Sequence, residues 1–130
     1  MGYLPKNILP KNNLIILDRW LTIAEIGHIY KDSDVIVIPY LNATQSGSPA
    51  WAMAAGKALV VTNTGGLPEQ VIDGQNGVIV EPQDSKTLAE AIKKLLLDEN
   101  LLKRMSSEST RLGKEEKSWE ASTALIFKNN

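Results

Sequence analysis

The chain is 130 residues long, a size that suits one domain built around one hydrophobic core. Its 14 basic and 15 acidic residues give a formal net charge of -1, which argues against nucleic-acid binding through bulk positive charge. The absence of cysteine excludes disulfides, thiolate metal sites and cysteine nucleophiles, and the single histidine, His28, excludes a metal site built from several histidines. No apolar run reaches the ~20 residues of a membrane span, and no signal peptide is evident, so we expect a cytoplasmic protein.

Four short apolar runs predict β-strands. None of the runs alternates apolar with polar residues, and continuous β-branched runs are typical of strands that are covered on both faces, as in a parallel sheet. The runs are Leu14–Leu17, Val35–Ile38, Leu59–Val61 and Val78–Val80.

The segments between and after these runs carry helical patterns. We expect helices over Thr22–Lys31, over the alanine-rich segment Ser48–Ala55, from a cap at Asp84 onward, from about Glu99, and over the tail Trp119–Phe127. Strand alternating with helix predicts one α/β domain over residues 1–130, a Rossmann-like parallel sheet of about four strands covered by helices.

The first candidate site lies in the loop before the alanine-rich helix. Ligands of such sheets bind beyond the carboxyl ends of the strands. The loop offers hydroxyls, an amide and backbone N–H groups at a helix start, and helix starts attract phosphate. These features predict a diphosphate or sugar-hydroxyl site, although a turn with a Ser/Thr cap would use the same residues. The loop residues are Ala43, Thr44, Gln45, Ser46 and Gly47.

A second candidate loop follows the third apolar run. Its glycine pair, Gly65 and Gly66, permits a sharp turn, and Pro68 with Glu69 is a favourable helix start. Glu69 would be favourable near a helix N-terminus with or without a ligand. We interpret His28 as structural or solvated, and Trp51 and Met53 as core residues, because none of them belongs to either loop.

Four motifs in order resemble one known family. They are Asp34-Val-Ile-Val-Ile-Pro-Tyr40, Ala52-Met-Ala-Ala-Gly-Lys57, Val60-Val-Thr-Asn-Thr-Gly-Gly-Leu-Pro-Glu69 and Asp73-Gly-Gln-Asn-Gly77. From about Leu14 to Leu97 the sequence is similar to the C-terminal, donor-binding half of retaining glycosyltransferases with the GT-B fold, family 4 (glycosyl transferases group 1). The resemblance is specific to the family and does not identify the sugar.

The resemblance implies glycosyl transfer, with retention, from a nucleotide-diphosphate sugar to a glycan or lipid acceptor. The sugar and diphosphate would lie against Ala43, Thr44, Gln45, Ser46 and Gly47, with Gly65 and Gly66 nearby. No obligatory metal and no cofactor is implied. The resemblance also implies an acceptor-binding domain as a partner, which would be a missing domain or a separate subunit. The protein would act in the cytoplasm or at a membrane surface.

Two departures from the family pattern concern activity. Many members carry two glutamates across the first loop, where this chain has Ala43 and Trp51. The Arg and Lys that usually clamp the diphosphate precede the first residue of this sequence, so two negative charges would lack their main partners. We therefore expect the isolated chain to lack a complete active site and to show little or no transferase activity.

A third departure concerns the sheet. In the family, two earlier strands separate the strand that matches Leu14–Leu17 from the one that matches Val35–Ile38, and both are absent here. We expect either that the first strand moves in beside the second, or that a second molecule covers the exposed edge and makes a homo-oligomer.

Two other functions stay open. The first is a non-catalytic nucleotide-binding or assembly module that pairs with a separate subunit. The second is a phosphoacceptor domain of the receiver type, which would need an acidic cluster at one end of the sheet. Asp18 follows the first predicted strand and Asp34 begins the second, so the sequence predicts that these two carboxylates lie at opposite ends.

Overall fold

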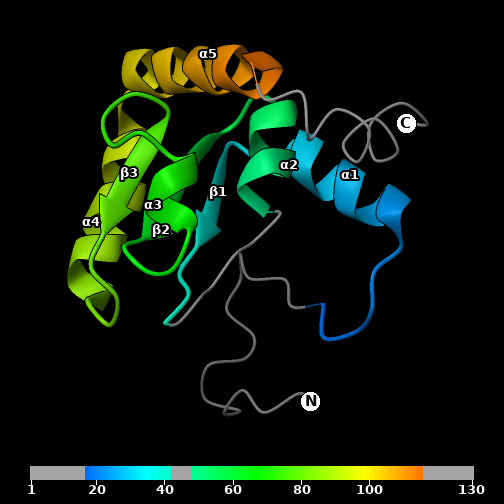
Figure 1. The fold of residues 1–130 in the computed structure, drawn as a ribbon, viewed down its shortest axis with the longest axis horizontal. Coiled ribbons are helices and arrows are strands. Elements are labelled where there is room, and N and C mark those ends of the chain that lie inside the picture. Colours follow the sequence, from blue (N-terminus) through cyan, green and yellow to red (C-terminus); the bar gives the residue numbers. More distant parts are fainter. Residues whose placement is uncertain (1–16, 42–47, 116–130) are drawn as a thin grey trace.

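A computed structural model describes residues 17–41 and 48–115, and it confirms the α/β class with a parallel sheet (Figure 1). The helices and strands are, in chain order, α1 (Ile23–Asp32), β1 (Val35–Ile38), α2 (Ser48–Ala54), β2 (Ala58–Thr62), α3 (Leu67–Gln70), β3 (Gly77–Val80), α4 (Ser85–Leu97) and α5 (Glu99–Glu115). Of the first predicted strand, only Leu17 is described, and it lies in irregular backbone before α1. The predicted helix over Trp119–Phe127 lies outside the described residues.

The described strands form a three-stranded sheet in the order β1-β2-β3. Both pairs are parallel: Val35 lies opposite Ala58 in the first pair, and Leu59 lies opposite Gly77 in the second. All five residues of the central strand β2 are buried, as expected for a strand that is covered on both faces. The outer strands β1 and β3 also contribute side chains to both faces of the core, but each contains two half-buried residues, so coverage is complete only at the centre of the sheet.

Two apolar layers cover the sheet, because successive side chains of a strand point to opposite faces. One layer joins the strands to α2 and α3, and the other joins them to α4 and α5. The buried side chains of the first layer are Ile36, Ile38, Ala52, Met53, Leu59, Val61, Leu67 and Val71. Those of the second are Ala58, Val60, Val80, Ala91, Leu95, Leu101 and Met105.

Side-chain caps fix where α1 and α4 begin. Thr22 Oγ1 accepts a hydrogen bond from the Glu25 N–H at 3.1 Å, and the Thr22 N–H donates to Glu25 Oε1 at 2.9 Å, which completes a capping box. A hydrogen-bonded ion pair with Arg19 and the Thr22 N–H together lower the pKa of Glu25 to about 2. The predicted cap of α4 is confirmed, because Asp84 Oδ1 accepts from the Thr87 N–H at 3.0 Å.

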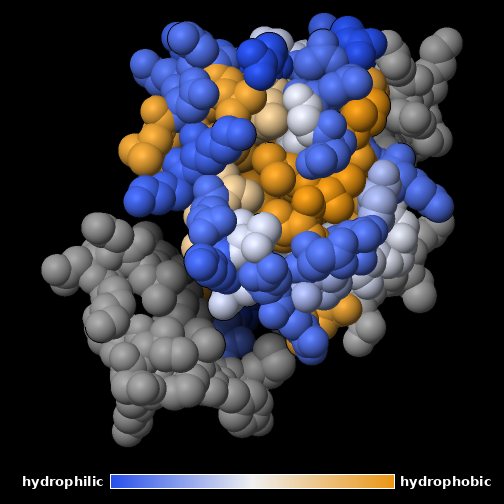
Figure 2. Space-filling model, turned by 90° about the vertical axis from the view of Figure 1, so that its left-hand side faces the viewer, coloured by the Kyte–Doolittle hydropathy of each residue, from blue (hydrophilic) through white to orange (hydrophobic). Residues whose placement is uncertain are grey.

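The end of the molecule that carries β3 and α4 has an apolar patch framed by hydrophilic side chains (Figure 2). Exposed apolar residues in these parts of the chain include Ile72, Leu96 and Leu97. Within the described residues, no helix combines the length and the apolar character needed to cross a membrane.

Candidate functional site

The carboxyl ends of β1, β2 and β3 meet at one edge of the sheet because the three strands are parallel (Figure 1). Three segments leave the sheet there: residues 39–41 after β1, residues 63–66 after β2 and residues 81–84 after β3. We call this region the carboxyl edge. In open α/β sheets, ligands bind at such an edge.

Three hydrogen bonds hold these segments together. Thr62 Oγ1, at the end of β2, donates to the Tyr40 carbonyl at 2.6 Å, and Thr62 itself is buried. The Asn63 N–H donates to the Val80 carbonyl at 2.8 Å. The Asn63 side-chain amide donates to Glu81 Oε1 at 3.2 Å. The starts of all three segments are therefore fixed relative to one another.

The glycine pair lies on the carboxyl edge, between β2 and α3. Gly65 is exposed and has a φ of 55°, a left-handed backbone conformation that glycine adopts without strain. Gly66 is buried and occupies the N-cap position of α3, where no side chain supplies a cap. Pro68 lies in the first turn of α3, as predicted. The sequence therefore predicted the position of this turn correctly, and its contact with a ligand stays a prediction.

The other predicted site residues, Ala43, Thr44, Gln45, Ser46 and Gly47, lie outside the described residues. Their contacts with a donor therefore stay predictions. The segment is bounded by Leu41, which is exposed on the carboxyl edge, and by Pro49, which is buried in α2.

A cavity of about 190 Å³ opens on the carboxyl edge beside the start of α4. Hydrogen bonds from the Thr87 backbone N–H and hydroxyl lower the pKa of Asp84, so this lining carboxylate is held as an anion by the helix that it caps. Gln83 has a φ of 62°, a left-handed conformation that sequence reasoning did not predict. The cavity is lined by Pro39, Leu41, Thr62, Glu81, Gln83, Asp84, Ser85 and Leu88.

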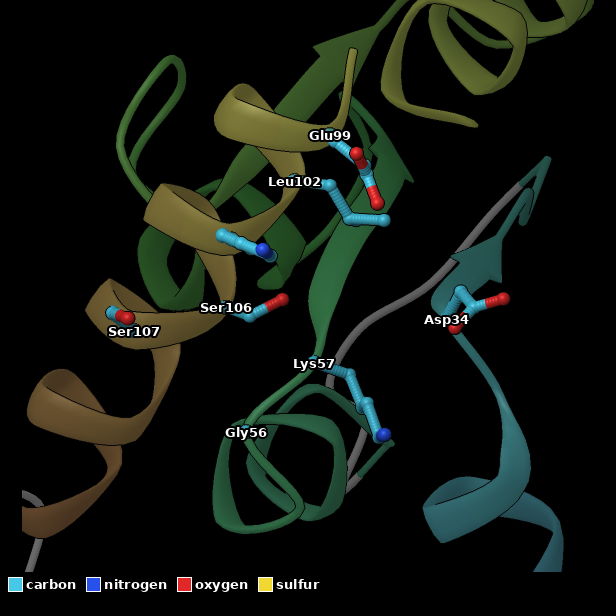
Figure 3. A pocket seen from close by; sticks show the side chains of 8 residues that line it. Asp34, Gly56, Lys57, Glu99, Leu102, Ser106 and Ser107 are labelled. Carbon is cyan, nitrogen blue, oxygen red and sulfur yellow. The ribbon is translucent and has the colours of Figure 1, made fainter. Parts of the chain in front are cut away.

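A larger cavity, of about 570 Å³, lies at the opposite end of β1 and β2 (Figure 3). Asp34 and Lys57, the residues that precede these strands, lie on one side of it, and the side chains of Leu102 and Ser106 project into it from α5. The Lys57 ammonium donates to the Lys31 carbonyl at 2.9 Å. This cavity is thus at the amino ends of the strands, away from the predicted site.

The remaining residues of interest do not converge on the carboxyl edge. His28 is exposed on α1, and Met53 is buried in the core, in agreement with the predictions. Trp51 is half-buried, and its ring lies 6.2 Å from that of Tyr30 in an edge-on arrangement. Asp34 lies at the amino end of β1, where it cannot serve the receiver-type acceptor role that needs the carboxyl end.

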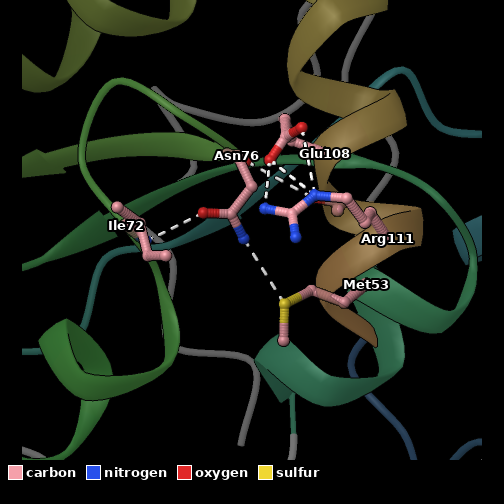
Figure 4. Close-up of polar contacts among 6 residues, drawn as sticks. Met53, Ile72, Asn76, Glu108 and Arg111 are labelled. Atoms are coloured by element: carbon pink, nitrogen blue, oxygen red, sulfur yellow. Dashed lines mark hydrogen bonds and ion pairs between the residues drawn. The ribbon is translucent and has the colours of Figure 1, made fainter. Parts of the chain in front are cut away.

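Asn76 is a structural residue whose role the sequence did not reveal (Figure 4). It is fully buried, and its Oδ1 accepts from the Ile72 N–H at 2.8 Å while its Nδ2 donates to Met53 Sδ at 3.4 Å. The hydroxyl of Ser109 on α5 donates to the Asn76 carbonyl at 3.4 Å. One side chain and its backbone thus connect the turn before β3 to α2, the helix that follows the predicted donor loop, and to α5.

Comparison with known proteins identifies the family. The model of the family described as glycosyl transferases group 1 matches residues 6–112. The chain therefore belongs to the glycosyl transferases group 1 family.

Curated relatives are longer than this chain. It is 33% identical over 104 residues to a D-inositol 3-phosphate glycosyltransferase of Corynebacterium jeikeium, and the match covers 80% of this chain and 25% of that protein. It is 31% identical over 117 residues to the uncharacterized glycosyltransferase MJ1178 of Methanocaldococcus jannaschii, with coverage of 88% and 33%. The chain thus spans a quarter to a third of these relatives.

Solved structures agree on the fold. Sucrose-phosphate synthase from Thermosynechococcus elongatus superposes with a TM-score of 0.67 at 28% identity, covering 75% of this chain and 25% of that one. The C-terminal domain of the group 1 glycosyltransferase LpcC from Francisella tularensis gives 0.67 at 27% identity, with coverage of 72% and 48%. Anabaena HepE, solved in complex with UDP, gives 0.70 at 22% identity, with coverage of 79% and 29%, and supports the fold alone.

Proposed function

We propose that this chain is the donor-binding part of a retaining, family 4 glycosyltransferase of the GT-B type, and that it binds a nucleotide-diphosphate sugar at the carboxyl edge. The observation that carries the proposal is the way Thr62 and Asn63 tie the three segments of this edge together next to the Gly65 turn. A preorganised edge of this kind limits the ordering that a ligand must impose on binding.

The chemistry proposed for the edge is recognition by neutral groups. Backbone N–H groups and the hydroxyls of Thr44 and Ser46 would donate to the diphosphate and to sugar oxygens. The absence of a side chain at Gly65 leaves its backbone open to close approach. At Trp51, where many members of the family have a carboxylate, the indole lies against Tyr30 and supplies no charge.

The reaction of the whole enzyme would break the bond between the anomeric carbon and the diphosphate oxygen. It would form a bond from that carbon to an acceptor hydroxyl, with retention of configuration, and the hydroxyl proton would leave with the nucleotide diphosphate. We propose a glycan or lipid acceptor held by a further domain or subunit. The names of several relatives add inositol phosphate to the acceptors worth testing. Without that part, and without a diphosphate clamp, this chain is proposed to show little or no turnover.

Calorimetric titration with UDP, GDP and their sugars tests donor binding directly. UDP is the first ligand to try because HepE was solved with it. We expect one nucleotide sugar to bind and the Thr62→Val variant to bind it more weakly, because valine keeps the shape of threonine and loses the bond to Tyr40. Thr110→Val, on the exposed side of α5, is the matched control.

If none of the nucleotides and nucleotide sugars tested binds, the proposal is contradicted. That result would favour the alternative function, a module that assembles with another subunit without binding a donor.

A further inference from the structure

The cavity at the amino ends of β1 and β2 has the size of a small-molecule site (Figure 3). Its volume of about 570 Å³ falls within the roughly 300–1,000 Å³ of typical ligand pockets, whereas the cavity on the carboxyl edge, at about 190 Å³, is smaller. Three parts of the chain line it: the residue before β1, the turn between α2 and β2, and the first half of α5. It is therefore a second candidate site, which the proposed donor site does not use.

Close packing of α5 against the turn after α2 fixes one wall of this cavity. Gly56, in that turn, has a φ of 72°, and a Cβ atom there would lie 2.7 Å from Thr110 Oγ1 on α5. The Gly56 N–H donates to the Met53 carbonyl at 3.0 Å. The Lys57 N–H donates to the Ala52 carbonyl, also at 3.0 Å, so the turn is tightly closed. The backbone that carries Lys57 is thus held in place before any ligand binds.

Four charged side chains line the cavity without pairing with one another. Two are positive, Lys57 and Lys103, and two are negative, Asp34 and Glu99. The half-buried Lys57 donates its ammonium N–H to the Lys31 carbonyl at 2.9 Å, a neutral acceptor that leaves the positive charge uncompensated. Within residues 17–41 and 48–115, the other three side chains form no ion pair and no hydrogen bond. All four charges are therefore available to a ligand.

The signs of these charges select the kind of ligand. A ligand with charges of one sign would be attracted to two of the four side chains and repelled by the other two. A zwitterion, which carries an ammonium and a carboxylate, can form charge-assisted hydrogen bonds with side chains of both signs. Leu102 and Ser106 project into the cavity from α5 and offer an apolar contact and a hydroxyl (Figure 3). An α-amino acid with an apolar side chain matches all of these groups.

We propose that this cavity binds an α-amino acid with an apolar side chain. The carboxylate of the ligand lies toward Lys57 and Lys103. The ammonium lies toward Asp34 and Glu99, and the apolar side chain packs against Leu102. The diphosphate of a nucleotide sugar has no positive group for the two carboxylates, so the cavity excludes the donor. The site is thus separate from the proposed donor site, and amino-acid binding does not depend on nucleotide binding.

Two-dimensional NMR of the whole chain, titrated with L-leucine, tests this site. We expect the amides of Lys57 and Ser106 to shift with a dissociation constant on the order of 1 mM, while those of Gly65 and Gly66 on the carboxyl edge stay unchanged. Leucinamide keeps only the ammonium and N-acetylleucine keeps only the carboxylate, so each is expected to bind at least about tenfold more weakly than leucine.

Charge-neutralising variants test the lining of the cavity. Asp34→Asn and Lys103→Gln are each expected to raise the dissociation constant for leucine about threefold or more, because each removes one charge from an exposed position. Lys114→Gln, on α5 but outside the cavity lining, is the matched control. Far-UV circular dichroism verifies that each variant is folded.

The proposal is overturned if leucine shifts neither the Lys57 nor the Ser106 amide at concentrations up to about 100 mM, far above the expected dissociation constant. Binding of leucinamide or N-acetylleucine as tight as that of leucine would also overturn it, because one charge would then suffice. So would a loss of affinity in Lys114→Gln equal to that in the two variants of the lining.

Discussion

At the scale of single residues, buried polar groups carry much of the specificity of this fold. Asn76 Oδ1 accepts a hydrogen bond from the Ile72 N–H, and Asn76 Nδ2 donates one to Met53 Sδ. Thr62, also buried, serves the carboxyl edge in the same way, and the exposed Asn63 adds a bond to Glu81. The bonds of Asn76 to Met53 and of Thr62 to Tyr40 join segments that are distant in sequence, whereas the bond of Asn76 to the Ile72 N–H closes a local turn. A buried donor or acceptor is left unpaired if its partner is removed.

Replacement of Asn76 by alanine is expected to lower the free energy of unfolding by about 1–3 kcal/mol, the usual cost of leaving a buried polar group unpaired. Urea denaturation measures the change. Gln75→Ala is the matched control, because Gln75 is the exposed neighbour in the same turn. Equal stability of the two variants would show that the Asn76 side chain does not hold the turn to α2.

Contacts between individual residues that are distant in sequence could not be predicted from the sequence. The bonds of Thr62 to Tyr40 and of Asn76 to Met53 depend on how distant segments are brought together, which no local pattern encodes. The left-handed Gln83 has no glycine or asparagine to indicate it. In contrast, the caps at Thr22 and Asp84 involve a partner three residues away, so the sequence alone carries their signal.

At the scale of helices and strands, hydrophobic periodicity predicted the elements well. Three of the four apolar runs became β1, β2 and β3, while the first, Leu14–Leu17, lies outside the described residues except for Leu17. The period of α4 and its cap gave the start of that helix correctly. The prediction that the strands are covered on both faces is confirmed most fully for β2, whereas β1 and β3 contribute side chains to both apolar layers but each keep two half-buried residues. The physical reason is that coverage depends on neighbours, and an apolar run looks the same in a central strand and in an edge strand.

Two of the three leucines at the end of α4 test which face of the helix packs against the sheet. Leu95 is fully buried against the sheet, whereas Leu97 is 75% exposed. We expect Leu95→Ala to lower the free energy of unfolding by about 2–5 kcal/mol, because it leaves a cavity. Leu97→Ala is expected to change it by less than about 0.5 kcal/mol. Thermal or urea unfolding compares the variants, and a similar loss in both would mean that α4 packs through a different face.

At the scale of the whole molecule, the chain belongs to the glycosyl transferases group 1 family, and its described strands form one parallel sheet. The carboxyl edge and the larger cavity at the amino ends lie at opposite ends of the same strands. The proposed donor site uses the carboxyl edge.

Chemical-shift mapping during a nucleotide-sugar titration tests whether the carboxyl edge binds the donor. The amides of Thr44 to Gly47, together with those of Gly65 and Gly66, are expected to shift on addition of one nucleotide sugar, while those around Lys57 and Ser106 stay unchanged. Shifts confined to the cavity at the amino ends, with no response at the carboxyl edge, would contradict the account.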